Sequence, residues 1–460
     1  MRASLPLLAL LAVVAWPGLA RANGVTAHAH MTDLAIEELP PGELRDLMTD
    51  PTMRDAYRTG SVFPDSGYAA GDAYGEIAHW EAFTQSYLDW MAAEHPPPYE
   101  TDDERRLVAF LLGQASHGMA DQVFDSLFMS RALAFDGDVS SLDEDEEYWL
   151  VVEHEPGIAP LVIWAPYDDL PDVFAAEREG HRPEITTIEF GLRRIGGVLD
   201  LLQASARAPY ARTWSESPWA ASSYYVEATP GSLPFIAPII ARYWQVLWDR
   251  LHGTDSLERS VIGRFPDDGA DNHEVDPRRP ESRVMIVFGH GLDAMTLTRE
   301  NVVLETMDGV AVSANPRFIY GAPFANAVLV DPEETLAYDT RYRVTIGTGV
   351  RDLEGRALPA PVVSTFRTRC AADRLGDCPA LPDPWTEPSG PPAGDAGPRA
   401  DAGPTLDATD AVDAASSLAP DAGAPSTSPS GCGCHAPSAA RGARWLWVIV
   451  SLALVLARRR

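Results

Sequence analysis

The first half of the chain carries apolar residues at intervals of three and four, the spacing of an amphipathic helix. This pattern predicts helices over residues 25–39, 77–92, 107–127, 188–202 and 233–251. Gly and Pro fall between these segments, as the connections of a helical bundle require. One connection, the GSVFPD segment that ends at Asp65, is predicted to be a turn in which Pro64 fixes the backbone. The pattern therefore predicts an all-α domain over residues 23–253.

Beyond residue 252 the pattern changes to short apolar runs that are rich in β-branched residues. The predicted strands are residues 283–288, 301–306, 310–313, 327–330, 341–346 and 363–366. Asp-Gly and Gly turns separate these runs, and strands at this spacing are typical of a sandwich of two sheets. The sequence therefore predicts an all-β domain over residues 260–369.

The two ends of the chain indicate export and display. Residues 1–22 combine an early Arg, an apolar run and a small-x-small motif, which predicts a cleaved secretory signal peptide. Residues 370–430 are rich in Pro, Ala and Asp and are predicted to form a disordered stalk, because they cannot bury a core. Residues 431–460 end in an apolar run and an Arg cluster, which predicts a C-terminal transmembrane helix.

The four cysteines fall into two pairs. Cys370 and Cys378 bracket a short loop and are predicted to form a disulfide in an oxidising compartment. Cys432 and Cys434 belong to the C-terminal tail, where a bond between them would be strained.

The chain of 460 residues has a formal net charge of −31, which changes the range of plausible partners. A surface this acidic repels nucleic-acid phosphate, so no nucleic-acid partner is expected, and it concentrates divalent cations. Part of this charge lies in an acidic run, residues 143–147, which is predicted to be a solvated helix face.

The segment with the strongest chemical signal is residues 107–127. His117, Asp121 and Asp125 follow one another at four-residue steps, so a helix places all three on one face. That face is otherwise apolar, and a carboxylate there requires a positive partner. The chain contains no Lys, so the partner is an Arg, the imidazole or a metal ion. We interpret the three residues as metal ligands; the alternatives are a solvated polar stripe and Asp–Arg pairing inside a bundle.

Further His and Asp side chains complete a possible cluster. His28 or His30, Asp65 and His79 lie in the same predicted helical domain. Four segments carry these candidates, namely NGVTAHAHMTDLAIEEL with His28, GSVFPD with Asp65, AHWEAF with His79, and LVAFLLGQASHGMADQVFDSL with His117 and Asp121. Together they resemble the zinc-dependent phospholipase C family, most of all its branch of glycosylphosphatidylinositol-specific phospholipase D catalytic domains.

The resemblance implies a site with two or three Zn²⁺ ions that activate water to hydrolyse a phosphodiester. Asp65 would bind metal and orient or deprotonate the water. The family often uses the mature N-terminal residue as a ligand, here Asn23. Asp125 stands where this branch has a His, and no His-x-x-x-Glu motif follows, so Glu153 and His154 are the nearest candidates for the remaining ligands.

Two other segments resemble known families. Residues 260–369 are similar to the bacterial Ig-like family of the surface-layer type, through Phe265-Pro266, the strand ending at Phe288 and the closing Phe366-Arg367-Thr368. Such modules are usually spacers or binding modules, and a passive spacer is the expectation here. The Cys-containing tail with its apolar run and basic end resembles the MYXO-CTERM type of sorting signal, which implies processing near the Cys and anchoring at the cell surface or outer membrane, or release after processing.

The sequence thus favours an exported, surface-anchored, zinc-dependent phosphodiesterase with a phospholipid-like substrate. Two alternatives remain open. In the first, the helical domain would be a single-strand nuclease of the same architecture. In the second, it would be a degenerate metal-binding module that serves adhesion. The phosphodiester that is cut, the metal count and the oligomeric state do not follow from the sequence.

Overall fold

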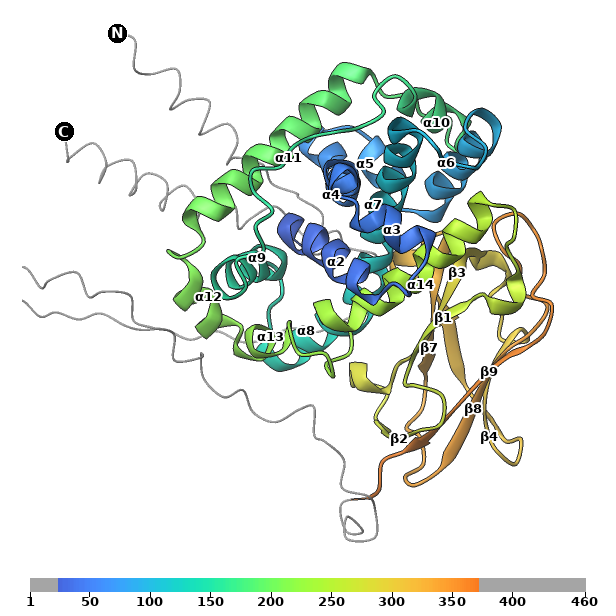
Figure 1. The fold of residues 1–460 in the computed structure, drawn as a ribbon. Coiled ribbons are helices and arrows are strands. Elements are labelled where there is room, and N and C mark those ends of the chain that lie inside the picture. Colours follow the sequence, from blue (N-terminus) through green and yellow to red (C-terminus); the bar gives the residue numbers. More distant parts are fainter. Residues whose placement is uncertain (1–23, 372–460) are drawn as a thin grey trace, which may run out of the picture. The chain divides into compact units, whose positions relative to one another are not determined.

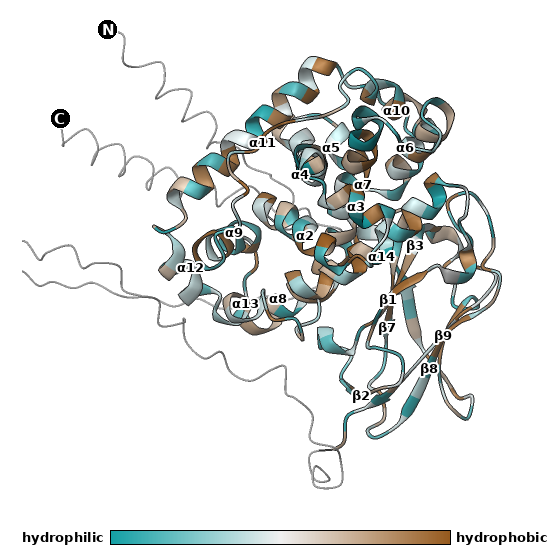
Figure 2. Ribbon diagram, in the orientation of Figure 1, coloured by the Kyte–Doolittle hydropathy of each residue, from teal (hydrophilic) through white to brown (hydrophobic). Residues whose placement is uncertain are grey.

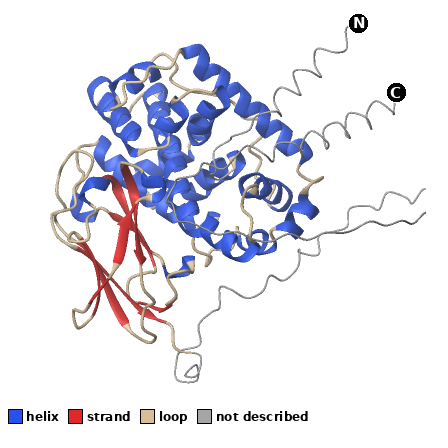
Figure 3. Ribbon diagram, turned by 180° about the vertical axis from the view of Figure 1, so that it is seen from behind, coloured by secondary structure: helices blue, strands red, loops and turns tan. Residues whose placement is uncertain are grey.

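The structure, a computed structural model, describes residues 24–371, and within them a helical region is followed by a β-sheet region (Figures 1 and 3). The helices are α2 (Val25–Glu38), α3 (Glu43–Thr49), α4 (Arg54–Ala70), α5 (Tyr74–Ala78), α6 (Glu81–Glu94), α7 (Asp102–Val123), α8 (Ser130–Asp136), α9 (Leu142–Glu153), α10 (Leu170–Ala176), α11 (Ile185–Ser205), α12 (Tyr210–Glu216), α13 (Pro218–Ser223) and α14 (Leu233–Leu251). A π-helical turn, η2 (Phe124–Met129), continues α7 directly. The expected order of helices and then strands is therefore present.

Most of the predicted helices coincide with observed ones. The segment 233–251 is α14, and 25–39 and 188–202 correspond to α2 and α11. In α11 the buried positions recur every three to four residues, and Figure 2 shows hydrophobic and hydrophilic residues alternating along this helix. Residues 77–92 do not form one helix, because the chain breaks at His79 and Trp80 between α5 and α6. His79 therefore lies at the end of α5, outside the helix that carries Phe83.

The predicted turn at residues 60–65 is wrong, since these residues lie inside α4. Pro64 lacks an N–H and so omits one helical hydrogen bond, a loss that usually ends a helix. Here α4 continues because it lies against α7 over most of its length, and tertiary packing of this kind dominates the stability of a helix. The same packing keeps Asp65 on a rigid element.

Two glycines allow α4 and α7 to approach closely. A Cβ atom on Gly60 would lie 2.3 Å from the carbonyl oxygen of Phe110, and one on Gly113 would lie 2.1 Å from that of Tyr57. Both distances are far shorter than a van der Waals contact, so only glycine permits this separation of the two backbones. The close approach brings Asp65 and His117 within reach of each other.

Replacing Gly113 by Ala is expected to lower the free energy of unfolding by about 1–3 kcal/mol, because α4 and α7 must move apart. Gly197, in the middle of α11, is a matched control, since a Cβ atom there meets nothing within 4 Å. Gly197→Ala is expected to be neutral or to stabilise by up to about 1 kcal/mol through helix propensity. Denaturant unfolding followed by circular dichroism measures both, and equal effects of the two substitutions would contradict the argument.

The strands form two sheets. They are β1 (Val261–Phe265), β2 (Ala270–His273), β3 (Val284–Asp293), β4 (Val302–Thr306), β5 (Ala311–Val312), β6 (Ala314–Arg317), β7 (Phe324–Pro332), β8 (Arg341–Ile346) and β9 (Val362–Thr368). The orders are β1-β3-β7-β6 and β2-β9-β8-β4-β5, and only β2 and β9 pair in parallel. Every predicted strand corresponds to one of these. β2 and β6 were not predicted because they have few apolar residues, and β1 was not predicted although three of its five residues, VIGRF, are apolar.

The first sheet is buried on both faces, which explains the unbroken apolar runs of β3 and β7. Met285 and Val287 of β3, with Ala327 and Leu329 of β7, join the hydrophobic core of the helices. The alternate residues, such as Ile286, join the core between the two sheets. Residues that alternate along a strand point to opposite faces, so one sheet serves two cores. The β region is therefore an integral layer and not a passive spacer.

Polar groups also join the helices to the sheet. Arg250 of α14 forms an ion pair with Glu81 of α6 at 2.8 Å, and both side chains are almost fully buried. The Nδ2 of Asn326 in β7 donates to Glu81 at 3.4 Å, and the Tyr243 hydroxyl donates to the same carboxylate. Gly291 of β3 leaves the necessary room, because a Cβ atom there would lie 2.3 Å from Cγ of Glu81.

Several predictions concern segments that the structure does not describe. The signal peptide, the stalk and the C-terminal tail, including Cys432 and Cys434, lie outside residues 24–371. Among the described residues, no helix has the length and apolar character that crossing a bilayer requires. Cys370 is buried and disulfide-bonded, and its predicted partner, Cys378, lies outside the described residues.

Candidate metal centre

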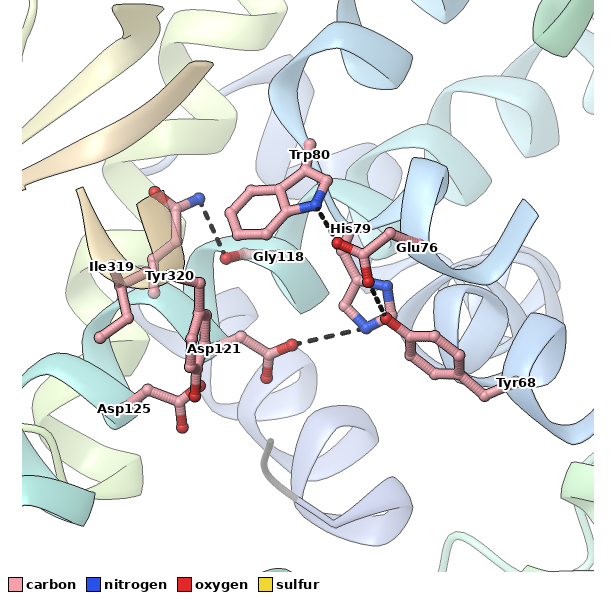
Figure 4. A pocket seen from close by; sticks show the side chains of 10 residues that line it. Tyr68, Glu76, His79, Trp80, Gly118, Asp121, Asp125, Ile319 and Tyr320 are labelled. Atoms are coloured by element: carbon pink, nitrogen blue, oxygen red, sulfur yellow. Dashed lines mark hydrogen bonds and ion pairs between the residues drawn. The ribbon is translucent and has the colours of Figure 1, made fainter. Parts of the chain in front are cut away.

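Five side chains from four separate segments converge in the interior of the helical region. His28 comes from α2, Asp65 from α4, His79 from the end of α5, and His117 and Asp121 from successive turns of α7. All five are buried. Figure 4 shows His79 and Asp121 pointing toward each other beside the pocket that they line.

The nitrogen and oxygen atoms of these side chains lie at distances typical of ligands that share metal ions. Nε2 of His117 lies 3.0 Å from Nε2 of His79, 3.5 Å from Oδ2 of Asp121 and 3.8 Å from Oδ1 of Asp65. Nε2 of His28 lies 3.1 Å from Oδ1 of Asp121, and its ring stacks on that of His117 at 3.6 Å. Two nitrogen ligands on a tetrahedral zinc ion stand about 3.3 Å apart, given Zn–N bonds of about 2.0–2.1 Å.

Backbone carbonyl groups set the orientation of two of the imidazoles. Nδ1 of His79 donates to the oxygen of Gly75 at 2.6 Å, and Nδ1 of His117 donates to that of Ser61 at 2.7 Å. A carbonyl oxygen only accepts, so Nδ1 carries the hydrogen in both rings. In the neutral tautomer the two Nε2 lone pairs then face each other. This is the arrangement in which a histidine binds metal through Nε2.

Three other polar atoms of the cluster lack hydrogen-bond partners within the described residues. Within residues 24–371 neither ring nitrogen of His28 nor Oδ1 of Asp121 has a hydrogen bond, although the short contact between them has the length of an ion pair. A buried polar atom without a partner costs about 1–3 kcal/mol, and more when it is charged. A cation would accept the facing lone pairs, give the unpaired atoms a partner and neutralise the two buried carboxylates. The donor set therefore fits a metal ion.

In the absence of metal, burial and the neighbouring charges have opposing effects on the pKa values of the cluster. Burial and the neighbouring His28 lower the pKa of His117 to about 3, although Asp121 and Asp65 act in the opposite direction. Burial opposes ionisation of Asp121, yet His28 and His117 bring its pKa down to about 2. The pKa of His79 is raised, since Asp65 and Asp121 outweigh the burial that lowers it. The carboxylates are thus ionised and His117 is neutral at neutral pH, as metal ligands must be.

The donor atoms form two overlapping groups, His28–His117–Asp121 and Asp65–His79–His117. His117 is common to both, but its Nδ1 is engaged with Ser61, so its Nε2 can bind only one ion. Asp121 has one oxygen near His28 and the other near His117 and His79, so its carboxylate would hold metal together with these imidazoles.

Asp125 belongs to neither of the two ligand groups. It is the second residue of the π-helical turn η2, and its Oδ2 accepts a hydrogen bond from the Tyr320 hydroxyl at 2.7 Å. Within the described residues its Oδ1 has no partner. Burial and the nearby Asp121 raise the pKa of Asp125 well above its usual value. The structure thus places Asp125 on the pocket wall and not within either ligand group.

The prediction that residues 143–147 form a solvated face is wrong. Asp145, Glu146 and Glu147 of α9 are buried. Glu147 accepts the N–H of Ala27 at 2.9 Å, at the start of the helix that carries His28. Neither carboxylate oxygen of Glu146 has a hydrogen-bond partner in the described part of the chain. The available signal was helical spacing, because Glu146 follows Leu142 by four residues and precedes Leu150 by four, both of them buried.

Replacing Glu147 by Gln is expected to stabilise the metal-free protein above pH 7. Burial raises the pKa of Glu147 to about 7 from a usual value of 4.5, so the folded state binds this proton more tightly than the unfolded state. Stability is therefore lost as pH rises from about 4.5 to 7, by up to about 3 kcal/mol. Unfolding curves of both proteins from pH 4 to 8 measure this, and a variant that is less stable at every pH would contradict it.

The other predicted ligands lie elsewhere. Glu153 accepts hydrogen bonds from the hydroxyls of Tyr210 and Tyr224, at 2.6 and 2.8 Å. The His154 ring stacks on Tyr225, whose hydroxyl pairs with Nε2 of His30 at 2.9 Å. Glu153 and His154 are therefore not brought to the cluster, and of the two N-terminal histidines it is His28 that reaches it. Asn23 lies outside the described residues.

A pocket of about 360 Å³ opens beside His79 and Asp121. Its other lining residues are Tyr68, Glu76, Trp80, Gly118, Gln122, Asp125, Ile319 and Tyr320 (Figure 4). Ile319 and Tyr320 come from η6 (Ile319–Gly321) in the β region, so both regions form the walls. Gly118 lies directly against the backbone of His79, because a Cβ atom there would be 2.1 Å from the His79 carbonyl oxygen. The cluster is thus reachable by a small organic ligand.

The fold and the site together define a helical protein with a buried His and Asp cluster, joined to an Ig-like sandwich. Residues 255–368 match the family model described as bacterial Ig-like domain, which confirms the predicted Ig-like domain. The chain is also similar to phosphatidylinositol-glycan-specific phospholipase D from Rattus norvegicus, with 32% identity over 114 residues, and from Bos taurus, with 34% over 112. The similar part is 23% of this chain and 13% of each relative.

Solved structures add no further information on the fold. The structure titled surface layer protein SbsC, domains 1-6, is 10% identical, and the alignment covers 75% of this chain and 45% of that one. Its TM-score is 0.20, and a second SbsC structure, covering 75% and 78% at 11% identity, scores 0.19. Values this low carry no argument about shared architecture.

Proposed function

We propose that this protein is a metal-dependent phosphodiesterase that acts on phospholipid-like substrates. The observation that carries the proposal is the pair of Nε2 atoms 3.0 Å apart on His79 and His117, both oriented by backbone carbonyls and flanked by two buried carboxylates. The partial similarity to phosphatidylinositol-glycan-specific phospholipase D supports phospholipid hydrolysis as the reaction class. Because the chain spans only 13% of those relatives, the whole activity of the relatives is not assumed.

Zinc is the metal that we propose, with two or three ions per chain. Three imidazoles and two carboxylates are the usual zinc donors, and imidazole favours zinc over magnesium or calcium. His28, Asp65, His79, His117 and Asp121 would hold the central ions. Asp125, Glu146 and Glu147 are further buried carboxylates beside them, which an additional ion would neutralise. When bound, the ions supply Lewis-acid stabilisation and lower the pKa of water.

The residues of the chain have distinct tasks in this scheme. The oxygen of Gly75 and that of Ser61 hold the imidazoles of His79 and His117 with Nδ1 as the donor, so Nε2 is the atom of each ring that would bind metal. Asp65 lies at the junction of both imidazoles, where its carboxylate can orient a water molecule and accept its proton. Trp80 and Tyr68 would form walls of the pocket beside the cluster. No nucleophilic side chain is required.

The proposal extends to the substrate and to the cellular location. An organic phosphodiester would enter the 360 Å³ pocket with its phosphate toward His79 and Asp121. The signal peptide and C-terminal tail that the sequence predicts support a location at the cell surface or outer membrane. The net charge of −31 makes the nuclease alternative less favourable, since it repels polyanions.

The test combines metal analysis with hydrolysis. The purified chain is loaded with zinc, its metal content is measured by elemental analysis, and it is assayed on bis(p-nitrophenyl) phosphate and on vesicles of phosphatidylcholine or phosphatidylinositol. Two or three zinc ions per chain with release of a phosphorylated or phosphatidyl product is the expected result. Bound zinc without hydrolysis of any of these would favour the adhesion alternative, and preferred cleavage of single-stranded DNA would favour the nuclease.

A further inference from the structure

Tyr320 has a backbone conformation that is rare for a bulky residue. Its φ is 55° and its ψ is 6°, within η6, the short turn between β6 and β7 of the Ig-like domain. The left-handed region is crowded by a Cβ atom, so residues other than Gly, Asn and Asp seldom adopt it. Strain of this kind persists where the surrounding structure enforces it, often at binding sites.

The Tyr320 side chain reaches from the Ig-like domain to the helical site. Its hydroxyl donates to Oδ2 of Asp125 at 2.7 Å, across a sequence separation of 195 residues. Its ring is one of the pocket walls, opposite Tyr68 and near Trp80 (Figure 4). Asp125 lies one helical turn after Asp121, so the residue that Tyr320 holds adjoins the ligand cluster directly.

The strand that follows Tyr320 is fixed to the same helix. Oε1 of Gln122, the neighbour of Asp121, accepts the backbone N–H of Asn326 at 2.8 Å and that of Ala327 at 3.1 Å. The Arg178 guanidinium lies 4.2 Å from the ring centroid of Phe324, at the start of β7. The hydrogen bonds of Gln122 thus help to set the position of η6 relative to α7.

We infer that the Ig-like domain completes the active site through Tyr320, which positions Asp125 with its hydroxyl and limits the space for the substrate with its ring. This inference rests on the proposed phosphodiesterase function. It assigns two separable effects to one side chain. Tyr320 is a positioning residue through Asp125, and its ring is a specificity-determining wall of the pocket.

The test uses the zinc-loaded full chain with Tyr320→Phe and Tyr320→Ala. Tyr338, half-exposed in the same domain and away from the pocket, gives the matched controls Tyr338→Phe and Tyr338→Ala. Steady-state kinetics are measured on whichever of the three phosphodiester substrates above the wild type hydrolyses fastest. Zinc content and circular dichroism are recorded for every variant.

Tyr320→Phe is expected to lower kcat about fivefold to tenfold with KM within twofold, because only the hydroxyl is lost. Tyr320→Ala is expected to raise KM at least fivefold in addition, because the wall is removed. The Tyr338 variants are expected to match the wild type. An active wild type whose Tyr320 variants show unchanged kcat and KM overturns this inference alone. A wild type that hydrolyses none of the substrates overturns the proposed function, and this inference with it.

Discussion

His117→Ala is expected to remove at least one bound metal ion per chain and to lower phosphodiester hydrolysis by about 100-fold or more. His117 is common to both groups of ligand atoms, and its Nε2 lies within 3.8 Å of donor atoms of three other residues. Substitutions that only disturb the residues around a ligand already reduce metal affinity about 10-fold to 100-fold, so loss of the ligand exceeds that range. Elemental analysis and the hydrolysis assay measure the two effects.

Two further variants separate metal loss from damage to the fold. Asp65→Asn keeps the volume of the side chain and removes its charge, so it is expected to weaken metal binding while the helical content stays unchanged. His95→Ala removes a histidine at the end of α6, which packs on Trp90 away from the cluster, and is expected to keep both metal and activity. Full metal content in His117→Ala would contradict the assignment of the centre.

Arg250→Ala is expected to lower the free energy of unfolding by about 3–5 kcal/mol. The substitution leaves the Glu81 carboxylate buried without its counter-charge, and removing one partner of a buried ion pair has this effect. Glu81 also joins α6 to β7 through Asn326, so the loss is expected to loosen helices and sheet together. Chemical unfolding monitored by circular dichroism gives the change in free energy.

The matched control is Arg193→Ala, which removes an exposed pair with Glu189 on α11. Exposed pairs contribute about 0–1 kcal/mol, so a change within that range is expected. The double variant Glu81→Gln with Arg250→Met removes both charges, and it is expected to recover much of the stability lost in Arg250→Ala. Equal destabilisation by Arg250→Ala and Arg193→Ala would show that the buried pair stabilises the fold no more than the exposed pair does.

Local periodicity was sufficient for much of the fold. The segment 233–251 is α14, and each predicted β-branched run overlaps a strand, because amphipathic spacing and strand propensity are properties of adjacent residues. The GSVFPD segment was predicted wrongly because Pro64 signals a break locally. The contact of Gly60 and Gly113 with the facing backbones, which keeps α4 intact, depends on a partner helix that local sequence does not show.

The residues of the candidate site were likewise predicted only in part. His28, Asp65, His79, His117 and Asp121 were singled out from their own segments, and the structure brings them together. Glu146 and Glu147 were missed, since a run of acidic residues suggests a solvated surface until the packing of α9 is known. Tyr320 could not be found from the sequence at all. Its contact with Asp125 depends on how the sheet packs on the helices, and the two residues are 195 positions apart in the sequence.

The shared core of helices and sheet also has a consequence for the order of folding. Asn326 meets Gln122 and Glu81 across more than 200 residues of chain, and Tyr320 meets Asp125 across 195. During synthesis the helices that carry the His and Asp cluster emerge long before these strands. Contacts of such long range form late and slowly. The pocket wall formed by Ile319 and Tyr320 is therefore expected to be absent until the β region has been made, although all five residues of the cluster are synthesised earlier.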